Sequence, residues 1–287
     1  MGNLVLIDAP SNLGLRPPAE GAVPGCYKTP GVLRDLGILD RLGAADGGVV
    51  TPGRYVGTWS PGDGVRNSAA IASYTRALAA RVAAVRSAGG FPVVLGGDCS
   101  ISLGAMLALR RSGRYGIAYL DGHDDFRHLG IADHVGAAAG EDLAIMTGRG
   151  AGDLADIDGL RPYVRDSDVM VLGVRTAESA DLRAAGIPFV TSEALMASAP
   201  VLSFPSSPDL DGFWVHVDID VLDPAYVSAV DSPDPGGLDP STLVSVLREL
   251  LARPGAAGFE LTVFDPDLDP DGHQAELVAD ILERSLR

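Results

Sequence analysis

Short apolar runs alternate with longer amphipathic stretches along this chain. Several of the short runs are apolar on both faces, as expected of strands that helices cover on each side. The longer stretches, such as 68–87 and 100–111, have the composition and spacing of helices. The predicted strands are 4–8, 92–95, 117–121, 168–174, 188–190, 213–220 and 258–264. This alternation predicts a doubly wound, mostly parallel sheet between two helical layers.

Two helices are expected near the C-terminus. Asp239 followed by Pro240 predicts an N-cap with proline at the first helical position, and 274–286 forms the last helix. The Gly/Pro-rich stretches 17–25, 52–64 and 231–240 resemble loops at the rim of a sheet more than domain boundaries. We therefore expect a single domain over residues 1–287.

Charge and composition exclude several classes of protein. The net charge is −16, from 38 acidic and 22 basic residues, and this field repels nucleic acids and anionic membranes. No apolar stretch approaches the roughly 18 residues of a membrane span, and the N-terminus does not resemble a signal peptide. Two cysteines, Cys26 and Cys99, provide no disulfide framework, which fits a reducing compartment. We expect a cytoplasmic protein that has no nucleic-acid or membrane partner.

Polar clusters follow three of the predicted strands. Gly96-Gly97-Asp98-Cys99 follows the first, Asp121-x-His123-x-Asp125 the second and Asp218-x-Asp220 the third. Carboxylates that converge at strand ends repel one another unless a cation joins them. Oxygen ligands with one imidazole suit manganese, and two ions would lower the pKa of a shared water. His216 shares the strand parity of Asp218 but lies deeper, so we expect a hydrogen-bonded histidine there.

In this order and at these distances the three clusters resemble the metal motifs of the ureohydrolases, the arginase/agmatinase/formimidoylglutamase family. Other matching segments are Asn12-x-Gly14, Thr29-Pro30, Gly173-Val174-Arg175, Pro235-Gly236-Gly237-Leu238 and Asp265-Pro266. The resemblance covers most of the chain. It implies a three-layer α/β/α fold of the arginase/deacetylase type, with a sheet of about eight strands.

The resemblance also implies a role for each cluster. Asp121 and Asp218 would bridge two Mn²⁺ ions, and His123 with Asp220 would complete one of them. Asp125 and the residue at position 99 would complete the other. Catalysis would rest on Asp125 and His123, with Asp125 orienting a metal-bridging hydroxide and taking its proton.

This chain departs from the family pattern at three positions. The usual first metal-ligand histidine is Cys99, a soft ligand that opens the site to Zn²⁺, Fe²⁺ or loss of one ion. This cysteine resembles a branch of the family that acts on N-hydroxyarginine. The guanidinium-binding glutamate aligns with Val263, and Glu260 has the opposite strand parity. The histidine proton shuttle aligns with Ala139.

Substrate-binding residues are predicted on two segments. Glu178 and Asp181 lie where the arginase branch binds an amino group. Arg127 lies where that branch holds a carboxylate, which a guanidinium can bind bidentately. His128 and His134 are most simply interpreted as solvated loop histidines, although either could replace the proton-shuttle histidine that aligns with Ala139.

The sequence therefore predicts an amidinohydrolase that cleaves a linear amidine or guanidine C–N bond of a small molecule other than plain arginine. A deacetylase-like amide hydrolase with one metal is an alternative, as is an arginase-like binding protein that has lost catalysis. The sequence is also compatible with a homo-oligomer.

Overall fold

The computed structural model describes residues 2–197 and 209–287. Within these ranges eight strands form one sheet in the order β2-β1-β3-β8-β7-β4-β5-β6, and every neighbouring pair is parallel. The strands are β1 Asn3–Ala9, β2 Ala45–Val49, β3 Gly90–Gly96, β4 Tyr115–Leu120, β5 Val169–Val174, β6 Phe189–Thr191, β7 Gly212–Asp218 and β8 Ala256–Thr262. The expected doubly wound parallel sheet is confirmed.

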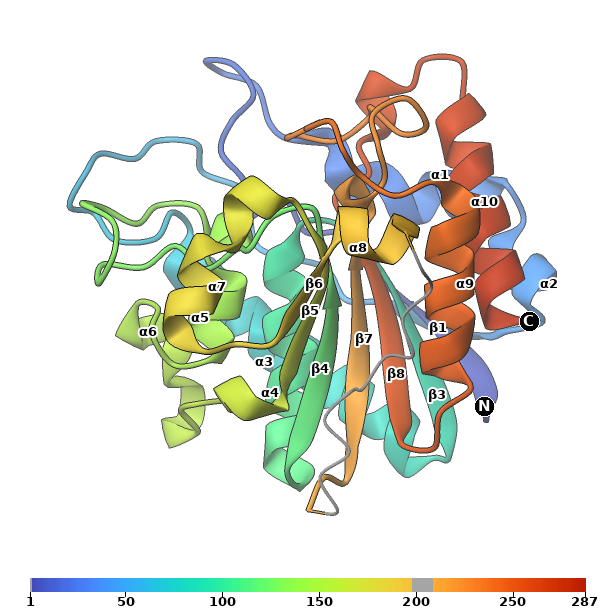
Figure 1. The fold of residues 1–287 in the computed structure, drawn as a ribbon, viewed down its shortest axis with the longest axis horizontal. Helices are drawn as coiled ribbons and strands as arrows, with labels where there is room; N and C mark the ends of the chain where they lie inside the picture. Colours follow the sequence, from blue (N-terminus) through green and yellow to red (C-terminus); the bar gives the residue numbers. More distant parts are fainter. Residues whose placement is uncertain (1, 198–208) are drawn as a thin grey trace.

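Helices cover both faces of this sheet (Figure 1). The α-helices are α1 Thr29–Asp35, α2 Ile38–Leu42, α3 Ser68–Ser87, α4 Ser102–Ser112, α5 Asp142–Met146, α6 Gly152–Ala155, α7 Ala180–Ala185, α8 Ser192–Ala197, α9 Pro240–Leu251 and α10 His273–Leu286. The 3-10 helices are η1 Gly25–Lys28, η2 Cys99–Ile101, η3 Ala138–Gly140, η4 Ile157–Gly159, η5 Asp166–Asp168, η6 Thr176–Ser179, η7 Ile219–Val221 and η8 Pro266–Leu268. Helices α3 to α7 pack on one face, and α1, α2, α8, α9 and α10 on the other.

Each central strand contributes to both cores because successive side chains point to opposite faces. In β4, Ile117 and Tyr119 pack with α3 and α4, whereas Ala118 and Leu120 pack with α9 and α10. All four side chains are fully buried. This two-sided burial explains why the strand sequences are almost continuously apolar.

Helix boundaries follow the predicted signals closely. Helix α3 spans the predicted residues, and α9 begins at Pro240 as expected. The Asp239 carboxylate accepts hydrogen bonds from the backbone N–H groups of Ser241 and Thr242 at 2.8 and 2.9 Å. These bonds satisfy donors that the first turn leaves without intrahelical partners. Among the described residues, no helix is long and apolar enough to cross a membrane.

Three details of the predicted sheet are wrong. The last strand, predicted for 258–264, spans Ala256–Thr262, so Val263 lies outside it. Strand β2 was not predicted, because its sequence Ala-Asp-Gly-Gly-Val lacks an apolar pattern and it lies at the sheet edge. The seventh strand ends at Asp218 and not at Asp220. The Asp218 carboxylate accepts a 2.8 Å hydrogen bond from the Asp220 N–H, and this contact turns the chain into η7.

Candidate metal centre

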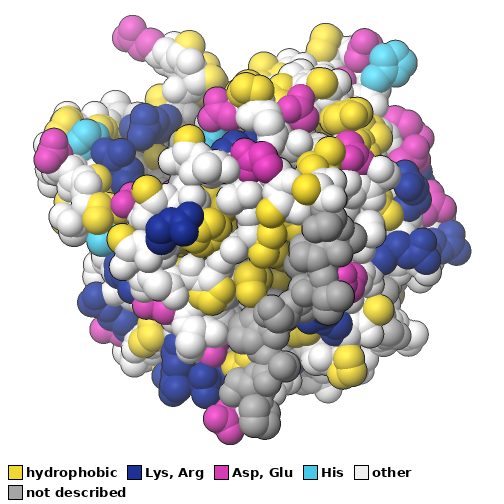
Figure 2. Space-filling view, viewed as in Figure 1, with side chains coloured by type: hydrophobic (Ala, Val, Ile, Leu, Met, Phe, Trp, Pro, Cys, Tyr) yellow, Lys and Arg dark blue, Asp and Glu magenta, His cyan; other side chains and the backbone are white. Residues whose placement is uncertain are grey.

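The three polar clusters meet at the carboxyl edge of the sheet. Neighbouring strands in the order β3-β8-β7-β4 end in Gly96, Thr262, Asp218 and Leu120. The loops that follow gather at the top of the molecule in Figure 1, and several acidic side chains are visible around the upper part of Figure 2. Segments distant in the chain are thereby brought together where α/β proteins bind ligands.

His123 lies between two aspartates. Its Nδ1 is 2.9 Å from Oδ2 of Asp220 and 3.7 Å from Oδ1 of Asp121. One ligand atom from each of the three side chains lies within 4.8 Å of the others. The loop holds this shape through backbone donors, because the N–H of His123 is 2.6 Å from Oδ1 of Asp121 and that of Gly122 is 3.1 Å from Oδ1 of Asp220. Two carboxylates and an imidazole in this arrangement can hold a divalent cation.

Cys99 reaches the cluster from the β3 loop. Its Sγ is 2.7 Å from Oδ2 of Asp218 and 3.1 Å from Oγ1 of Thr262. The loop passes so close to the segment after β1 that a Cβ on Gly97 would lie 1.8 Å from the carbonyl oxygen of Ser11. Only glycine fits there, and this close approach puts Cys99 beside Asp218.

Asp125 sits on strained backbone at the edge of the cluster. Its φ is +43°, a left-handed conformation that non-glycine residues seldom adopt. Its Oδ2 accepts a hydrogen bond from the Tyr119 hydroxyl at 2.9 Å, and the same hydroxyl is 2.9 Å from Oδ1 of Asp142. One hydroxyl proton cannot serve both carboxylates. Burial raises the pKa of Asp142 to about 7, so a second proton is available to this pair near neutral pH.

The electrostatics of the cluster favour a cation. Burial raises the pKa of Asp218 well above its usual range, and the charges of Asp220 and Asp121 raise it further. Burial and the charge of Asp121 likewise raise the pKa of Asp220. Although burial opposes a charged imidazole, Asp121 and Asp220 raise the pKa of His123. The cluster thus favours positive charge, and Oδ2 of Asp121 is a buried acceptor without a hydrogen-bond partner among the described residues. The residues present fit divalent metal.

His216 lies two residues before Asp218 on β7 and is fully buried, as expected from its strand parity. Its Nδ1 is 2.8 Å from Oε1 of Glu260, which faces it on β8. The expected hydrogen bond is therefore present. Glu260 is held by this contact and is itself fully buried, so it does not lie in the place of the glutamate that the sequence lacks at Val263.

A cavity of ≈ 230 Å³ adjoins the motif that carries His123 and Asp125. The intervening residue Asp124 lines it, together with Arg127 and Asp181. Nε of Arg127 donates to the carbonyl oxygen of His134 at 3.1 Å, which holds the guanidinium side chain against the loop. Two of the three predicted substrate-binding residues are thus brought together. The side chain of Glu178 lies outside the described residues.

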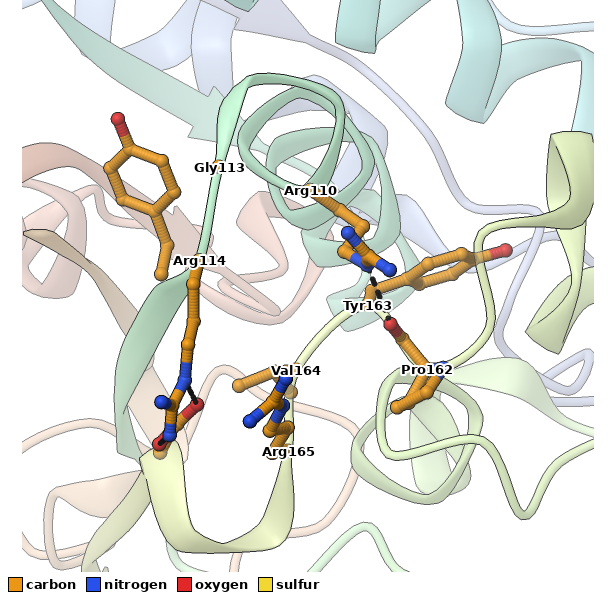
Figure 3. Close-up of a pocket in the computed structure, with 9 residues that line it drawn as sticks. Arg110, Gly113, Arg114, Pro162, Tyr163, Val164 and Arg165 are labelled. Atoms are coloured by element: carbon orange, nitrogen blue, oxygen red, sulfur yellow. Dashed lines mark hydrogen bonds and ion pairs between the residues drawn. The ribbon is translucent and has the colours of Figure 1, made fainter. Parts of the chain in front are cut away.

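A second cavity, of ≈ 140 Å³, lies at the opposite edge of the sheet (Figure 3). Arg110 and Arg114 line it beside the start of β4. Arg114 forms a bidentate pair with Asp168, with two N···O distances of 2.8 Å, and Nε of Arg110 donates to the Pro162 carbonyl oxygen at 3.1 Å. These arginines make local contacts far from the cluster of Asp121, Asp218 and Asp220, so we assign this cavity no part in the chemistry.

The positions that depart from the family pattern lie around the cluster. Val263 is 2% exposed and has a φ of +73°, and its N–H donates to the Gly97 carbonyl oxygen at 2.7 Å. Ala139 is buried in η3. His128 accepts a 3.0 Å hydrogen bond from the N–H of Gly130, and the His134 ring lies 5.5 Å from that of Trp59. Both histidines make local loop contacts.

Sequence reasoning missed Tyr119, Asp142 and Thr262 as members of the site. Tyr119 precedes the second motif by two residues on β4, so its parity places it beside Asp121. Thr262 ends β8 opposite Asp218 in the register. These two could have been found from parity and from the strand order. Asp142 could not, because only tertiary packing brings the start of α5 against Tyr119.

Metal should stabilise the folded protein measurably. Mutual repulsion among Asp121, Asp218 and Asp220 is relieved by cations that bind the native site and not the unfolded chain. At a free metal concentration of about 100 times Kd, the gain is about 2.7 kcal/mol. We expect chelation to lower Tm by roughly 5 °C or more, and Mn²⁺ or Zn²⁺ to restore it, in differential scanning fluorimetry. An unchanged Tm would argue against a metal centre.

Comparisons with known proteins show the family to which the chain belongs. A model of the arginase family matches residues 33–286. The chain is 30% identical over 224 residues to the arginase of Bacillus caldovelox, covering 73% of this chain and 75% of that protein. It is 31% identical over 264 residues to the formimidoylglutamase of Halobacterium salinarum, covering 85% and 82%. The solved structure of the Bacillus caldovelox arginase superposes with a TM-score of 0.87 at 25% identity, covering 100% of this chain and 98% of that one. The chain therefore belongs to the arginase family.

Proposed function

We propose that this protein is a metal-dependent amidinohydrolase that cleaves the linear C–N bond of an amidine or guanidine on a small amino-acid-like molecule. One observation carries the proposal: Asp124, the residue after His123 of the Asp121–His123–Asp220 cluster, lines a cavity together with Arg127 and Asp181. The cluster supports hydrolysis, and the cavity supports recognition of a zwitterion.

The metal ligands we propose are Cys99, Asp121, His123, Asp125, Asp218 and Asp220. Two divalent ions held by them would lower the pKa of a bound water, so that a nucleophile is available near neutral pH. We expect Mn²⁺ at the site of His123 and Asp220, because its ligands are oxygens and one imidazole. The arginase family supports a binuclear centre.

Asp125 is the proposed general base. Without metal, burial together with the charges of Asp121 and Asp142 raises its pKa well above the usual range. The Tyr119 hydroxyl fixes one of its oxygens, which leaves the other to take a proton from the attacking water and pass it to the departing amine. This hydrogen bond also holds the side chain on its strained backbone.

Arg127 and Asp181 are the proposed anchors of the substrate's far end. A guanidinium can bind the α-carboxylate bidentately, and a carboxylate can bind the α-ammonium. Glu178, on η6 next to α7, is proposed as a second acid for the ammonium. Anchoring at these groups would direct the other end of a linear molecule toward the carboxylate cluster, since Asp124 lies between His123 and Asp125 and also lines the cavity.

Replacing Arg127 tests the anchor. Arg127→Gln should raise KM for a carboxylate-bearing substrate about tenfold with little change in kcat, because about 1.5 kcal/mol of charge-assisted binding is lost equally in ground and transition states. Agmatine-like substrates without a carboxylate should be unaffected. The exposed Arg54→Gln is a control for the same change of charge. A fall in kcat alone would contradict the assignment.

Urea release tests the function itself. Protein purified without chelator is assayed with arginine, agmatine, guanidinobutyrate, N-hydroxyarginine and formimidoylglutamate, and its metal content is measured. We expect two ions per chain and release of urea or an amide analogue from at least one substrate. One zinc ion with hydrolysis of amides and no urea would support the deacetylase-like alternative. Two ions with no turnover of any substrate would support a binding protein.

A further inference from the structure

The imidazole of His216 has one nitrogen paired and one unpaired. Nδ1 is 2.8 Å from Oε1 of Glu260, and both side chains are fully buried. Among the described residues, Nε2 has no hydrogen-bond partner. The ring stacks on Tyr119, with centroids 4.4 Å apart and planes 13° from parallel, so its orientation is fixed from the side as well as from the end.

An unpaired buried nitrogen is costly. A buried polar atom without a hydrogen-bond partner destabilises the folded protein. In the neutral ring, a proton on Nδ1 that is donated to Glu260 leaves a lone pair on Nε2. A histidine that donates one N–H to a carboxylate while presenting the other nitrogen is the arrangement found at most histidine metal ligands.

His216 lies close to two other candidate ligands. One ligand atom each of His216, Cys99 and Asp121 lies within 4.8 Å of the other two, and all three side chains are buried. Oδ2 of Asp121 is likewise buried and unpaired within the described part of the chain. These two unpaired atoms belong to side chains that approach the Cys99 side chain, and a bound cation would explain both.

We propose that His216 is a metal ligand, which together with Cys99 and Asp121 binds one of the two ions. The loop after β3 has a cysteine and no imidazole at position 99. The imidazole would then come from β7, which is separated from β3 by β8 in the sheet. Glu260 is a positioning residue that selects the tautomer and orients the ring. This inference rests on the proposed function only in requiring that metal binds at the cluster.

The ligand set predicts which metal this site prefers. A thiolate and an imidazole are softer donors than the carboxylates around His123, and they favour Zn²⁺, Co²⁺ or Fe²⁺ over Mn²⁺. The two halves of the centre should therefore differ in metal selectivity. The thiolate–imidazole half should retain zinc in the presence of excess manganese, whereas the His123 half should exchange.

X-ray absorption on zinc-loaded wild-type protein gives the first test. With two ions per chain, we expect one sulfur and two imidazoles per pair of ions, the imidazoles coming from His123 and His216. One imidazole per pair would overturn the proposal, and so would the absence of sulfur. The measurement needs no variant and is independent of catalysis, so failure of the proposed activity would leave it unchanged.

Cobalt titration of variants gives the second test. Wild-type protein should show a sulfur-to-cobalt charge-transfer band, and His216→Asn should weaken binding at that site by at least tenfold and shift the band. Glu260→Gln should lower the affinity by about 10–100-fold, as expected when the hydrogen-bond partner of a ligand is altered. His128→Asn, in a loop outside the cluster, is the matched control.

Folding is checked by the near-ultraviolet circular dichroism and Tm of each metal-free variant. A folded His216→Asn protein that binds two cobalt ions with wild-type affinity and an unchanged charge-transfer band would exclude His216 as a ligand. If this variant does not fold, the absorption measurement on the wild type decides the question alone.

Discussion

Asp125→Asn should lower kcat by about 10²–10⁴-fold, the usual contribution of a general base. The amide has the size of the carboxylate but cannot accept a proton. Tyr119 can still donate to its oxygen, so the local hydrogen bond and the turn at this residue should survive. The measurement is kcat at saturating metal, since loss of a ligand charge also weakens metal binding.

The control for this variant lies in the same loop. Asp133 is exposed, and Asp133→Asn makes the same change of charge away from the cluster. It should retain the parent rate. Metal content and Tm are measured for both proteins. If Asp125→Asn with a full complement of metal works within tenfold of the parent, another group takes the proton, and the role given to Asp125 is wrong.

Val263→Glu should raise kcat/KM for arginine relative to N-hydroxyarginine by about 10–100-fold. The expected gain is the 1.5–3 kcal/mol of a hydrogen bond to a charged group. Val263, the residue after β8, has an isopropyl group where the family pattern has a glutamate, so the parent protein should favour a substrate that is neutral at that point. Arginine should be a poor substrate of the parent protein. A glutamate also avoids a β-branched side chain at a φ of +73°.

Val263→Gln separates charge from shape at this position. It should leave the preference between the two substrates nearly unchanged, because it adds no negative charge. Glu260 cannot supply that charge in the parent, since it is fully buried against His216. Efficient turnover of arginine by the parent would point to another acid, with Glu178 the first to examine, and the alignment of this strand would then be wrong.

Strong local signals made most of the fold predictable. Two-sided apolar runs marked the central strands, and Asp239-Pro240 marked the start of α9 to the residue. Strand β2 was not predicted because it is stabilised by pairing with β1 at the edge of the sheet. Its sequence, which contains two glycines, has no strand pattern of its own. The end of β7 was predicted two residues too late because the Asp218 side chain accepts a hydrogen bond from the Asp220 N–H and ends the strand there.

The residues proposed as ligands could be found in the sequence, but their hydrogen-bond partners were harder to predict. Asp121, His123 and Asp220 form spaced motifs, and the structure brings them within reach of one another. The hydrogen-bond partner of His216 could not be predicted from the sequence. Glu260 lies 44 residues farther along the chain and faces His216 only because of the register of β7 and β8. Sequence parity gave the direction of the side chain without revealing what it faces.

The spacing of the ligands along the chain also bears on how the protein folds. Cys99 and Asp218, whose side chains are in contact, are 119 residues apart. Parallel strands from both halves of the chain must pair before these side chains meet, and such long-range pairing is slow. Metal therefore cannot nucleate folding, and its capture should be among the last kinetic steps. Cobalt colour that develops after the far-ultraviolet signal during refolding would record the moment at which the two halves of the sheet join.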